Sequence, residues 1–429
     1  MWVPCSYCSS EWFWRQIGGG PAIGEKVGDM LYSTAMKAQL GRVVLKPGRE
    51  KSVRNRHPWI FSGAIEHAEG QSDLVQVTSN QGEYLATGTL NRRSQIAVRL
   101  LTWDAAEKVD GAFWQRRLER AIAGRAQLAA DPATNAYRLV HAEADGLPGL
   151  IVDRYGPWLV IQCLTAGMAQ RRAEMAALLA ELLAPAGIYA RDDADVRLKE
   201  GLALETGLLQ GEEPPDRVEI VEHERRFLVD VRRGHKTGFY LDQRENRRRV
   251  TAYCDGQEAL NAFAYTGAFG VYAARAGARS VTNVDTSAEA LALAEENLAL
   301  NDCGPQEMVT GDVFQVLRRY RREGRTFDLI ILDPPKFAAS QAEVMDAARG
   351  YKDVNLSAMR LLRPGGMLVS FSCSGLVSAD LFQKILFGAS VDAGRDAQII
   401  DRLAQGSDHP VLLTFPESAY LKGFACRVW

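Results

Sequence analysis

Phe327-Asp-Leu-Ile-Ile-Leu-Asp-Pro-Pro-Lys336 is the most informative segment of this chain for its fold. Apolar residues run up to Asp333 and stop there, as in a buried strand of an open α/β sheet that presents reactive groups at its carboxyl end. A second apolar stretch, Leu368-Val-Ser-Phe-Ser-Cys-Ser-Gly375, ends at the thiol of Cys373. Parallel strands end at one edge of a sheet, so the pattern predicts a carboxylate and a thiol side by side.

Strand and helix patterns alternate around these two stretches. Strands are predicted at 259–263, 280–285, 308–310, 327–333 and 367–372, and helices at 267–276, 287–300, 313–322, 351–362 and 379–393. Such alternation predicts a parallel, doubly wound, Rossmann-like sheet. Two closing strands, at 411–415 and 424–428, are predicted to form an antiparallel hairpin at the edge.

Shorter patterns before this region predict further domains. Strand patterns at 43–45, 59–61, 74–77, 84–86 and 96–100 are typical of a small β-barrel. A helix at 113–130, strands at 149–153 and 158–162, and a helix at 169–183 predict a small α+β domain. The Gly211-Glu-Glu-Pro-Pro215 stretch indicates a linker, and two strands turn around Glu222-His-Glu224 after it. We therefore divide the chain into a leader at 1–36, with Met36 as the natural start, a barrel at 37–112, a central domain at 113–216 and an α/β domain at 217–429.

The composition is that of an ordinary globular protein. The 429 residues include 51 basic and 53 acidic ones, so that any nucleic-acid surface must be local. No apolar run reaches the ~20 residues that span a bilayer. The seven cysteines are scattered and odd in number, and no second pair follows Cys5 and Cys8 at zinc spacing. We expect a cytoplasmic protein with neither a membrane segment nor a metal.

An adenosine-binding pattern lies in Leu260-Asn-Ala-Phe-Ala-Tyr-Thr-Gly-Ala-Phe-Gly270, which predicts a strand, a glycine turn and a helix. Asp285 ends the next strand, where a carboxylate can accept both ribose hydroxyls. Asp312 lies where an adenine amino group could be bound. NAD and S-adenosylmethionine both carry adenosine, but Tyr265 replaces the first glycine of a dinucleotide fingerprint, which favours S-adenosylmethionine. The predicted cofactor residues here are Tyr265, Thr266, Gly267, Asp285, Asp312 and Asp333.

A basic turn opens the barrel. It contains Lys46, Arg49, Lys51 and Arg54 and lies before Trp59. A cluster of this kind beside an aromatic ring suits an RNA backbone with a base stacked nearby. A solvated loop explains the same composition equally well.

Several motifs together resemble those of the bacterial 23S ribosomal RNA cytosine-C5 methyltransferases that carry a PUA domain. They are Gly234-His-Lys-Thr-Gly-Phe-Tyr-Leu-Asp-Gln-Arg-Glu-Asn-Arg247, the Tyr-Thr-Gly turn, Asp333-Pro-Pro-Lys-Phe337, Phe371-Ser-Cys-Ser-Gly375, His409-Pro and Tyr420-Leu-Lys-Gly-Phe424. The resemblance runs from about Leu40 to Trp429. It implies a PUA barrel, a central domain, a Rossmann-like methyltransferase domain and S-adenosylmethionine as cofactor. It also implies that Phe239, Asp242 and Arg244 help to form the cofactor pocket.

The resemblance gives the basic stretch before the catalytic sheet a role as well. Arg232 and Arg233, like Arg247–Arg249, could hold phosphates, although a solvated helix face is nearly as good an explanation for any one of them. Lys336, which follows the Asp-Pro-Pro motif, joins the predicted RNA-binding set. The implied partner is 23S ribosomal RNA, free or in a large-subunit precursor, and a homodimer is compatible with the sequence.

The implied chemistry uses Cys373 and Asp333 as catalytic residues. C5 of cytosine is a poor nucleophile, and addition of a thiolate to C6 makes it enamine-like. We expect the surroundings of Cys373 to lower its thiol pKa, and Asp333 to bind the amino and N3 edge of the base. Many related enzymes have a second cysteine after the motif proline to assist release, whereas this chain has Lys336 there. The target base must be flipped out or single-stranded.

Two alternatives stay open on the sequence. Asp-Pro-Pro followed by Phe337 also suits enzymes that methylate amino groups of bases, which need no thiol. An RNA-binding assembly factor with a vestigial cofactor site is the other alternative, against which the intact Gly267, Asp285 and Asp333 argue.

Overall fold

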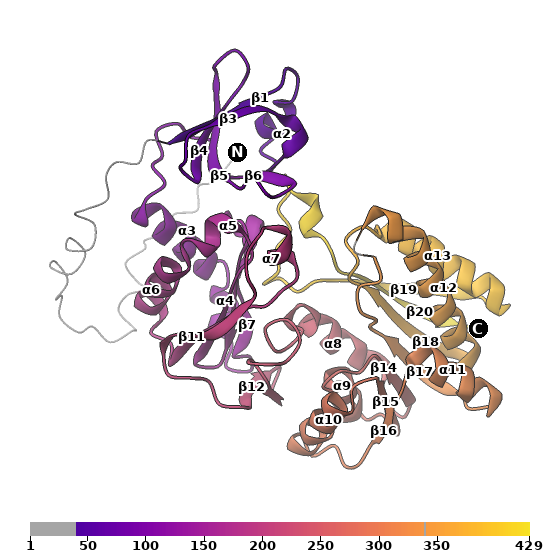
Figure 1. Ribbon diagram of the computed structural model, residues 1–429. Helices are drawn as coiled ribbons and strands as arrows, with labels where there is room; N and C mark the ends of the chain where they lie inside the picture. Colours follow the sequence, from indigo (N-terminus) through magenta and orange to yellow (C-terminus); the bar gives the residue numbers. More distant parts are fainter. Residues whose placement is uncertain (1–39, 339) are drawn as a thin grey trace, which may run out of the picture. The chain divides into compact units, whose positions relative to one another are not determined.

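The computed structural model describes residues 40–338 and 340–429 (Figure 1). The predicted leader at 1–36 lies outside these residues. Within them the strands form three larger sheets and one hairpin.

The first sheet contains the predicted barrel strands. Its order is β2-β6-β5-β4-β1-β3. The elements are β1 (Gly41–Leu45), α2 (Lys51–Arg54), β2 (Trp59–Phe61), η2 (Ser62–Ala64), β3 (Ile65–Glu69), β4 (Leu74–Thr78), β5 (Tyr84–Leu90) and β6 (Ile96–Thr102). Val43, Leu45, Val77 and Val98 fill its core. The sequence patterns missed β3, because its Ile-Glu-His-Ala-Glu stretch is largely exposed and has no apolar run.

The central region has a five-stranded sheet in the order β11-β10-β9-β8-β7. Its elements are α3 (Gly111–Ala123), α4 (Ala126–Ala129), β7 (Ala136–His141), η3 (Ala142–Asp145), β8 (Leu150–Tyr155), β9 (Trp158–Cys163), α5 (Ala166–Ala169), α6 (Arg172–Leu183), β10 (Gly187–Asp192), α7 (Val196–Lys199) and β11 (Glu205–Gly211). The prediction of one continuous helix at 113–130 is wrong, since two helices, α3 and α4, occupy this stretch. The chain breaks it after Ala123, where buried Arg125 donates from Nη1 and Nη2 to the two carboxylate oxygens of Asp145, both at 2.8 Å.

A two-stranded hairpin precedes the last sheet, at the place predicted. It pairs β12 (Val218–Glu222) with β13 (Arg225–Val229). His223 and Glu224 form the turn with positive φ angles. Ile220 and Phe227 of the hairpin share one hydrophobic cluster with Tyr155 of β8 and Val271 of α9 (Ala268–Arg275).

The last sheet is the predicted Rossmann-like one, in the order β16-β15-β14-β17-β18-β20-β19. Its strands are β14 (Glu258–Ala262), β15 (Ser280–Asp285), β16 (Glu307–Thr310), β17 (Phe327–Leu332), β18 (Leu362–Ser372), β19 (Ala397–Ala404) and β20 (Lys422–Val428). The first five are parallel, and β20 lies antiparallel between β18 and β19.

The prediction of a hairpin at 411–415 and 424–428 is wrong for its first strand and correct for its second. Only the second strand exists, and its outer partner is β19. Residues 411–415 lie in a loop, with Leu413 96% exposed, before the short helix η7 (Pro416–Ser418). Because β19 is a mostly exposed edge strand, it lacks the continuous apolar run by which the inner strands were recognised.

Helices cover both faces of this sheet (Figure 1). One face carries α11 (Val313–Arg322), α12 (Val344–Leu361) and α13 (Ala379–Ala393), whose apolar side chains form one cluster with β17, β18 and β20. The other face carries α8 (Arg244–Val250), α9 and α10 (Ala288–Leu300). The short helices η4 (Leu241–Gln243), η5 (Thr251–Tyr253) and η6 (Gln341–Glu343) connect these elements. Among the described residues, no helix has the length and apolar character required to cross a membrane.

Candidate active site

The predicted carboxylate and thiol follow neighbouring strands. Residue Leu332 of β17 pairs in parallel register with Ser370 of β18, so both strands end at the same edge. Asp333 comes directly after β17 and Cys373 directly after β18. The Cys373 Sγ lies 4.0 Å from the carbonyl oxygen of Pro334. The structure therefore brings together the two residues that the sequence selected for chemistry.

The surroundings of Asp333 favour its neutral form. Burial, with a smaller contribution from the charge of Asp242, raises the pKa of Asp333 to about 7. The Gln243 amide donates to Oδ1 of Asp333 at 3.0 Å. At neutral pH this carboxyl group can therefore act as an acid as well as an acceptor.

The expectation of a lowered thiol pKa is wrong for the free protein. Burial, followed by the negative charges of Asp333 and Asp242, raises the pKa of Cys373 to about 11. Lys236 acts in the opposite direction. The sequence predicted Asp333 beside the thiol. The burial of Cys373 and the nearby charge of Asp242 result from tertiary packing.

Lys422 is a member of this site that the sequence reasoning did not single out. It lies opposite Ser372 in the β18–β20 register, and its Nζ donates to the carbonyl oxygens of Ser374 and Val377, both at 2.7 Å. Burial lowers the pKa of Lys422 to about 8. The ammonium group therefore holds the turn that follows Cys373. Its only sequence signal was its place in the Tyr-Leu-Lys-Gly-Phe motif.

The predicted adenosine residues meet at the ends of β14, β15 and β16. The Asp285 Oδ2 accepts from the backbone N–H of Tyr265 at 2.8 Å, and its Oδ1 accepts from that of Ser287 at 3.0 Å. Asp312 caps α11 by accepting from the N–H of Gln315 at 3.0 Å. The Thr266 hydroxyl is buried without a hydrogen-bond partner. These groups fit an adenosine, because hydroxyls of a ligand can satisfy the orphaned Thr266 and the remaining lone pairs of Asp285.

The two glycines of this turn serve packing. A Cβ at Gly267 would lie 2.6 Å from Cβ of Ala294 in α10, and one at Gly270 would lie 2.4 Å from Oδ1 of Asn283 in β15. Gly267 also has a φ of +76°. Both glycines therefore let the helices and strands around the turn approach each other closely.

Two residues of the segment at 238–244, Phe239 and Arg244, are buried in the interior. Arg244 is fully buried and donates to both carboxylate oxygens of Asp408, at 3.0 and 2.9 Å. Phe239 is buried beneath the guanidinium of Arg247, 4.7 Å from its ring centre. The contacts of Arg244 and Phe239 indicate a positioning role for both. Asp242 differs from them, since its Oδ1 is buried without a hydrogen-bond partner.

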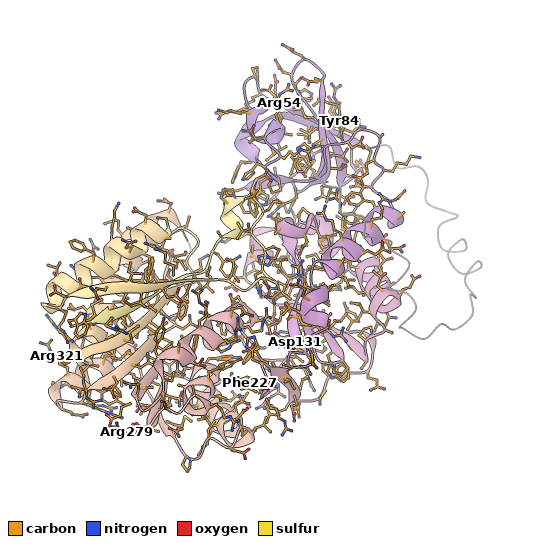
Figure 2. The ribbon with its side chains drawn as sticks, turned by 180° about the vertical axis from the view of Figure 1, so that it is seen from behind. Arg54, Tyr84, Asp131, Phe227, Arg279 and Arg321 are labelled. Carbon is orange, nitrogen blue, oxygen red and sulfur yellow. The ribbon has the colours of Figure 1, made fainter. Side chains whose placement is uncertain are left out.

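The predicted RNA-binding residues are mostly exposed. Arg54, labelled in Figure 2, pairs with Glu83, its Nη1 lying 2.9 Å from Oε1. Lys46 donates to the carbonyl of Gly63, while Arg49, Lys51 and Lys336 are exposed. Arg232 and Arg233 both lie near Asp216.

Arg247 cannot hold a phosphate, which corrects one of the sequence interpretations. Its side chain is buried, and its Nε and Nη2 each donate at 2.7 Å to the carboxylate of Glu222. Arg249 pairs with Asp401.

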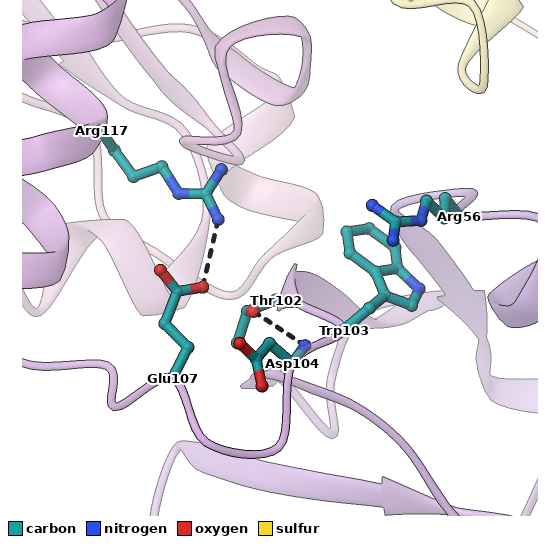
Figure 3. Close-up of a pocket in the computed structure, with 6 residues that line it drawn as sticks. All are labelled: Arg56, Thr102, Trp103, Asp104, Glu107 and Arg117. Carbon is teal, nitrogen blue, oxygen red and sulfur yellow. Dashed lines mark hydrogen bonds and ion pairs between the residues drawn. The ribbon is translucent and has the colours of Figure 1, made fainter.

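A separate pocket of about 290 Å³ lies at the end of β6 (Figure 3). Arg56, Trp103, Asp104, Glu107 and Arg117 contribute to its lining, and the Arg56 guanidinium lies 5.9 Å from the Trp103 ring centre. It contains none of the predicted catalytic residues and carries charges of both signs. In the part of the chain that the structure describes, no group of His, Cys, Asp and Glu side chains is arranged to hold a metal.

Comparison with known proteins identifies the class. A model of the PUA-like domain matches residues 43–103, and a model of the S-adenosylmethionine-dependent methyltransferases matches residues 197–411. A solved structure from Streptococcus mutans superposes with a TM-score of 0.80 at 24% identity, covering 91% of this chain and 100% of that one. A second structure, of a protein in complex with SAH, gives the same values. The fold and site define an S-adenosylmethionine-dependent methyltransferase with a PUA-like domain.

Curated relatives define the family more closely. A Shewanella amazonensis protein named ribosomal RNA large subunit methyltransferase I is 51% identical over 393 residues, covering 90% of this chain and 99% of the relative. A Salmonella schwarzengrund protein of the same name is 49% identical over 396 residues, covering 91% and 98%. The chain belongs to this family, as the sequence resemblance implied.

Proposed function

We propose that this protein methylates C5 of a cytosine in large-subunit ribosomal RNA, through a covalent bond between Sγ of Cys373 and C6 of the base. The observation that carries the proposal is the position of Cys373 beside Asp333 at the shared edge of β17 and β18. The names of the relatives support the choice of large-subunit ribosomal RNA as substrate.

Asp333 would activate the ring. With a pKa of about 7, a protonated Asp333 can donate to N3 of cytosine while its other oxygen accepts from the amino group. Drawing electrons toward N3 makes C6 more electrophilic, so the sulfur can add there. S-adenosylmethionine, when bound, supplies the methyl group for C5 and a positive sulfonium charge.

The thiolate forms only in the assembled complex under this proposal. The free protein holds the pKa of Cys373 at about 11, partly through the charges of Asp333 and Asp242. Neutral Asp333 no longer disfavours the thiolate, and Lys236 favours it. The high resting pKa also keeps the thiol protected from oxidation, since the thiolate is the reactive form.

The packing of Phe337 disfavours the amino-group alternative. Its ring lies 4.6 Å from that of Tyr351 and 6.2 Å from that of Phe314, among core residues of α12 and α11. An aromatic side chain held in this way is not free to stack on a target base. An assembly factor without catalytic activity would not require a thiol beside a carboxyl group of raised pKa, as Cys373 and Asp333 are.

RNA containing 5-fluorocytosine at the target position tests the mechanism. The fluorine cannot leave as a proton, so elimination fails and the enzyme should stay attached to its substrate. With S-adenosylmethionine present, we expect a denaturation-resistant adduct that maps to Cys373 in the unmodified enzyme and is absent from Cys373→Ala. If Cys373→Ala still methylates at a comparable rate, or the adduct maps to another cysteine, the amino-group alternative becomes the better proposal.

A further inference from the structure

Asp242 is a second carboxylate in this site, and the chemistry proposed above leaves it without a role. It lies in η4, directly before Gln243, whose side-chain amide donates to Oδ1 of Asp333 at 3.0 Å. The segment that carries Asp242 therefore contacts the acid of the site. The resemblance assigned Asp242 to the cofactor pocket together with Phe239 and Arg244, but its contacts differ from theirs.

One oxygen of Asp242 is held and the other is free. The hydroxyl of Tyr420 donates to Oδ2 at 2.6 Å, and the backbone N–H of Gly406 donates to the Asp242 carbonyl at 2.9 Å. The Oδ1 atom is buried and has no hydrogen-bond partner. A buried carboxylate oxygen without a partner is costly in free energy, so that its presence indicates a ligand or a proton to be accepted.

The charge of Asp242 acts on both catalytic residues. It contributes to the raised pKa of Asp333 and to that of Cys373. The Oδ1 atom of Asp242 is buried away from bulk water. The negative charge of the Asp242 carboxylate nevertheless helps to raise the pKa of the Cys373 thiol.

We propose that Asp242 is the base that removes the C5 proton after methyl transfer, a step that rests on the function proposed above. The C5–H bond breaks and its proton passes to Oδ1 of Asp242. The electron pair of that bond re-forms the C5–C6 double bond, and the C6–S bond breaks to return the thiolate of Cys373. No other reagent is needed. Asp242 would take the role of the second cysteine that assists release in many related enzymes, at whose position this chain has Lys336.

Other groups near the thiol are less suitable as this base. Burial lowers the pKa of Lys422 only to about 8, so at neutral pH it is mainly an ammonium group without a lone pair, and it donates to two backbone carbonyls. The Tyr240 hydroxyl is engaged with Nδ1 of His235 at 3.3 Å. Asp333 carries the proton for N3 at this stage. Two carboxylates in different environments can thus divide the acid and base roles between them.

The variant Asp242→Asn tests the assignment with ordinary, unfluorinated target RNA. The amide cannot take the proton, so methyl transfer should occur once and release should fail. We expect a denaturation-resistant adduct that contains labelled methyl at about one per enzyme, maps to Cys373, and turns over at least about 100-fold more slowly than wild type. The dissociation constant for S-adenosylmethionine, measured by calorimetry, should change less than about twofold, because under this proposal the carboxylate takes a proton and does not hold the cofactor.

Two further variants make the result specific. Tyr420→Phe keeps the carboxylate but removes its donor, and should slow release less than Asp242→Asn while giving the same adduct. Asp302→Asn, the same chemical change in an exposed loop after α10, should leave turnover unchanged. Thermal melting of each variant shows whether it is folded.

The outcomes separate this inference from the proposed function. An Asp242→Asn enzyme that turns over at the wild-type rate overturns the assignment. One that binds S-adenosylmethionine weakly and forms no adduct overturns it too, and returns Asp242 to the cofactor pocket. Failure of the proposed function appears instead in the wild-type enzyme, which would then give no adduct with 5-fluorocytosine RNA.

Discussion

Asp333 and Cys373 show how environment alters the chemistry of a residue. Both are ordinary side chains in the sequence, yet the fold raises the pKa of Asp333 to about 7 and that of Cys373 to about 11. Burial is the larger cause for both, and neighbouring carboxylates add to it. A thiol that is protonated at rest and an acid that is half protonated near neutral pH suit a site that becomes active only when it is assembled.

The raised pKa of Asp333 predicts a pH-dependent stability. The unfolded chain ionises this carboxyl near its ordinary value of 3.8, whereas the folded protein does so at about 7. The folded form therefore binds more protons between these values, and stability is lost as pH rises through that range and is level above it. Asp333→Asn abolishes this loss. We compare the melting temperature of Asp333→Asn with that of wild type at two pH values. The difference, variant minus wild type, should be about 1–3 °C larger at pH 8 than at pH 5.

Scanning fluorimetry across pH 4–9 measures the difference. Asp302→Asn is the matched control and should show no such pH dependence. An Asp333→Asn difference that is the same at pH 5 and pH 8 would mean that the carboxyl titrates at its ordinary value.

Close packing of elements places the site at the sheet edge. The turn at Gly267 begins α9 and brings it against α10, where Ala294 leaves no room for a Cβ. Gly267→Ala combines this clash with a φ of +76°. We expect it to lower the free energy of unfolding by about 2–4 kcal/mol, as measured in urea.

Gly256→Ala is the matched control for this change. Gly256 has a φ of +69° but nothing within 4 Å of a built Cβ, so the variant keeps only the backbone strain. It should lower the free energy of unfolding by about 1 kcal/mol. Equal losses in the two variants would show that Ala294 moves aside without cost.

A buried ion pair joins α8 to the hairpin. Arg247 and Glu222 are both buried and are joined by two hydrogen bonds, and the hydroxyl of Tyr272 also donates to Glu222 at 3.1 Å. Arg247→Met leaves that carboxylate without its cation, and should cost about 3–5 kcal/mol of stability in chemical unfolding. The double variant Arg247→Met with Glu222→Leu should recover most of the loss, because neither charge then remains buried. A double variant as unstable as Arg247→Met would show that packing, not charge, dominates.

On the scale of the whole molecule, polar contacts connect the three sheets. Asp408 accepts from Arg244 of α8, from the N–H of Arg138 in β7 and, through its carbonyl, from Arg125. Glu143 accepts from Trp59 of β2 at 2.8 Å and from Arg99 of β6 at 2.7 Å. The barrel, the central sheet and the catalytic sheet therefore meet through side chains whose burial requires their partners.

We expect RNA binding to depend on the basic turn of the barrel, which lies far from the catalytic sheet in sequence. Replacing Lys46, Arg49 and Lys51 together with Ala should weaken binding of ribosomal RNA fragments. The logarithm of affinity should also depend less steeply on the logarithm of salt concentration, by roughly 0.7–0.9 for each phosphate that these side chains neutralise. Filter binding at several salt concentrations measures both effects.

A charge-matched control lies on α11, where Arg318, Arg321 and Arg322 are exposed; Arg321 is labelled in Figure 2. Their replacement with Ala should change the salt slope little. If the two triple variants behave alike, the barrel turn contributes only overall charge.

The fold class, the family and the cofactor could be predicted from the amino-acid sequence alone. Apolar runs ending at Asp333 and Cys373 predicted parallel inner strands, because strands buried on both faces need continuous apolar residues. The motifs predicted the family through residues that lie far apart in the chain. Local patterns, however, describe only local neighbours, which is why the exposed strands β3 and β19 were missed.

The surroundings of each reactive group depend on packing and could not be predicted from the sequence. Burial and the charges of Asp333 and Asp242, which come from separate elements, raise the Cys373 pKa that the sequence reasoning expected to be lowered. Arg247 was interpreted as a possible phosphate-binding arginine and Arg244 as part of the cofactor pocket, but Glu222 and Asp408 hold the two side chains in the interior. Ion pairing and desolvation depend on distances between residues that the chain brings together only when it folds, so no pattern along the sequence could supply them.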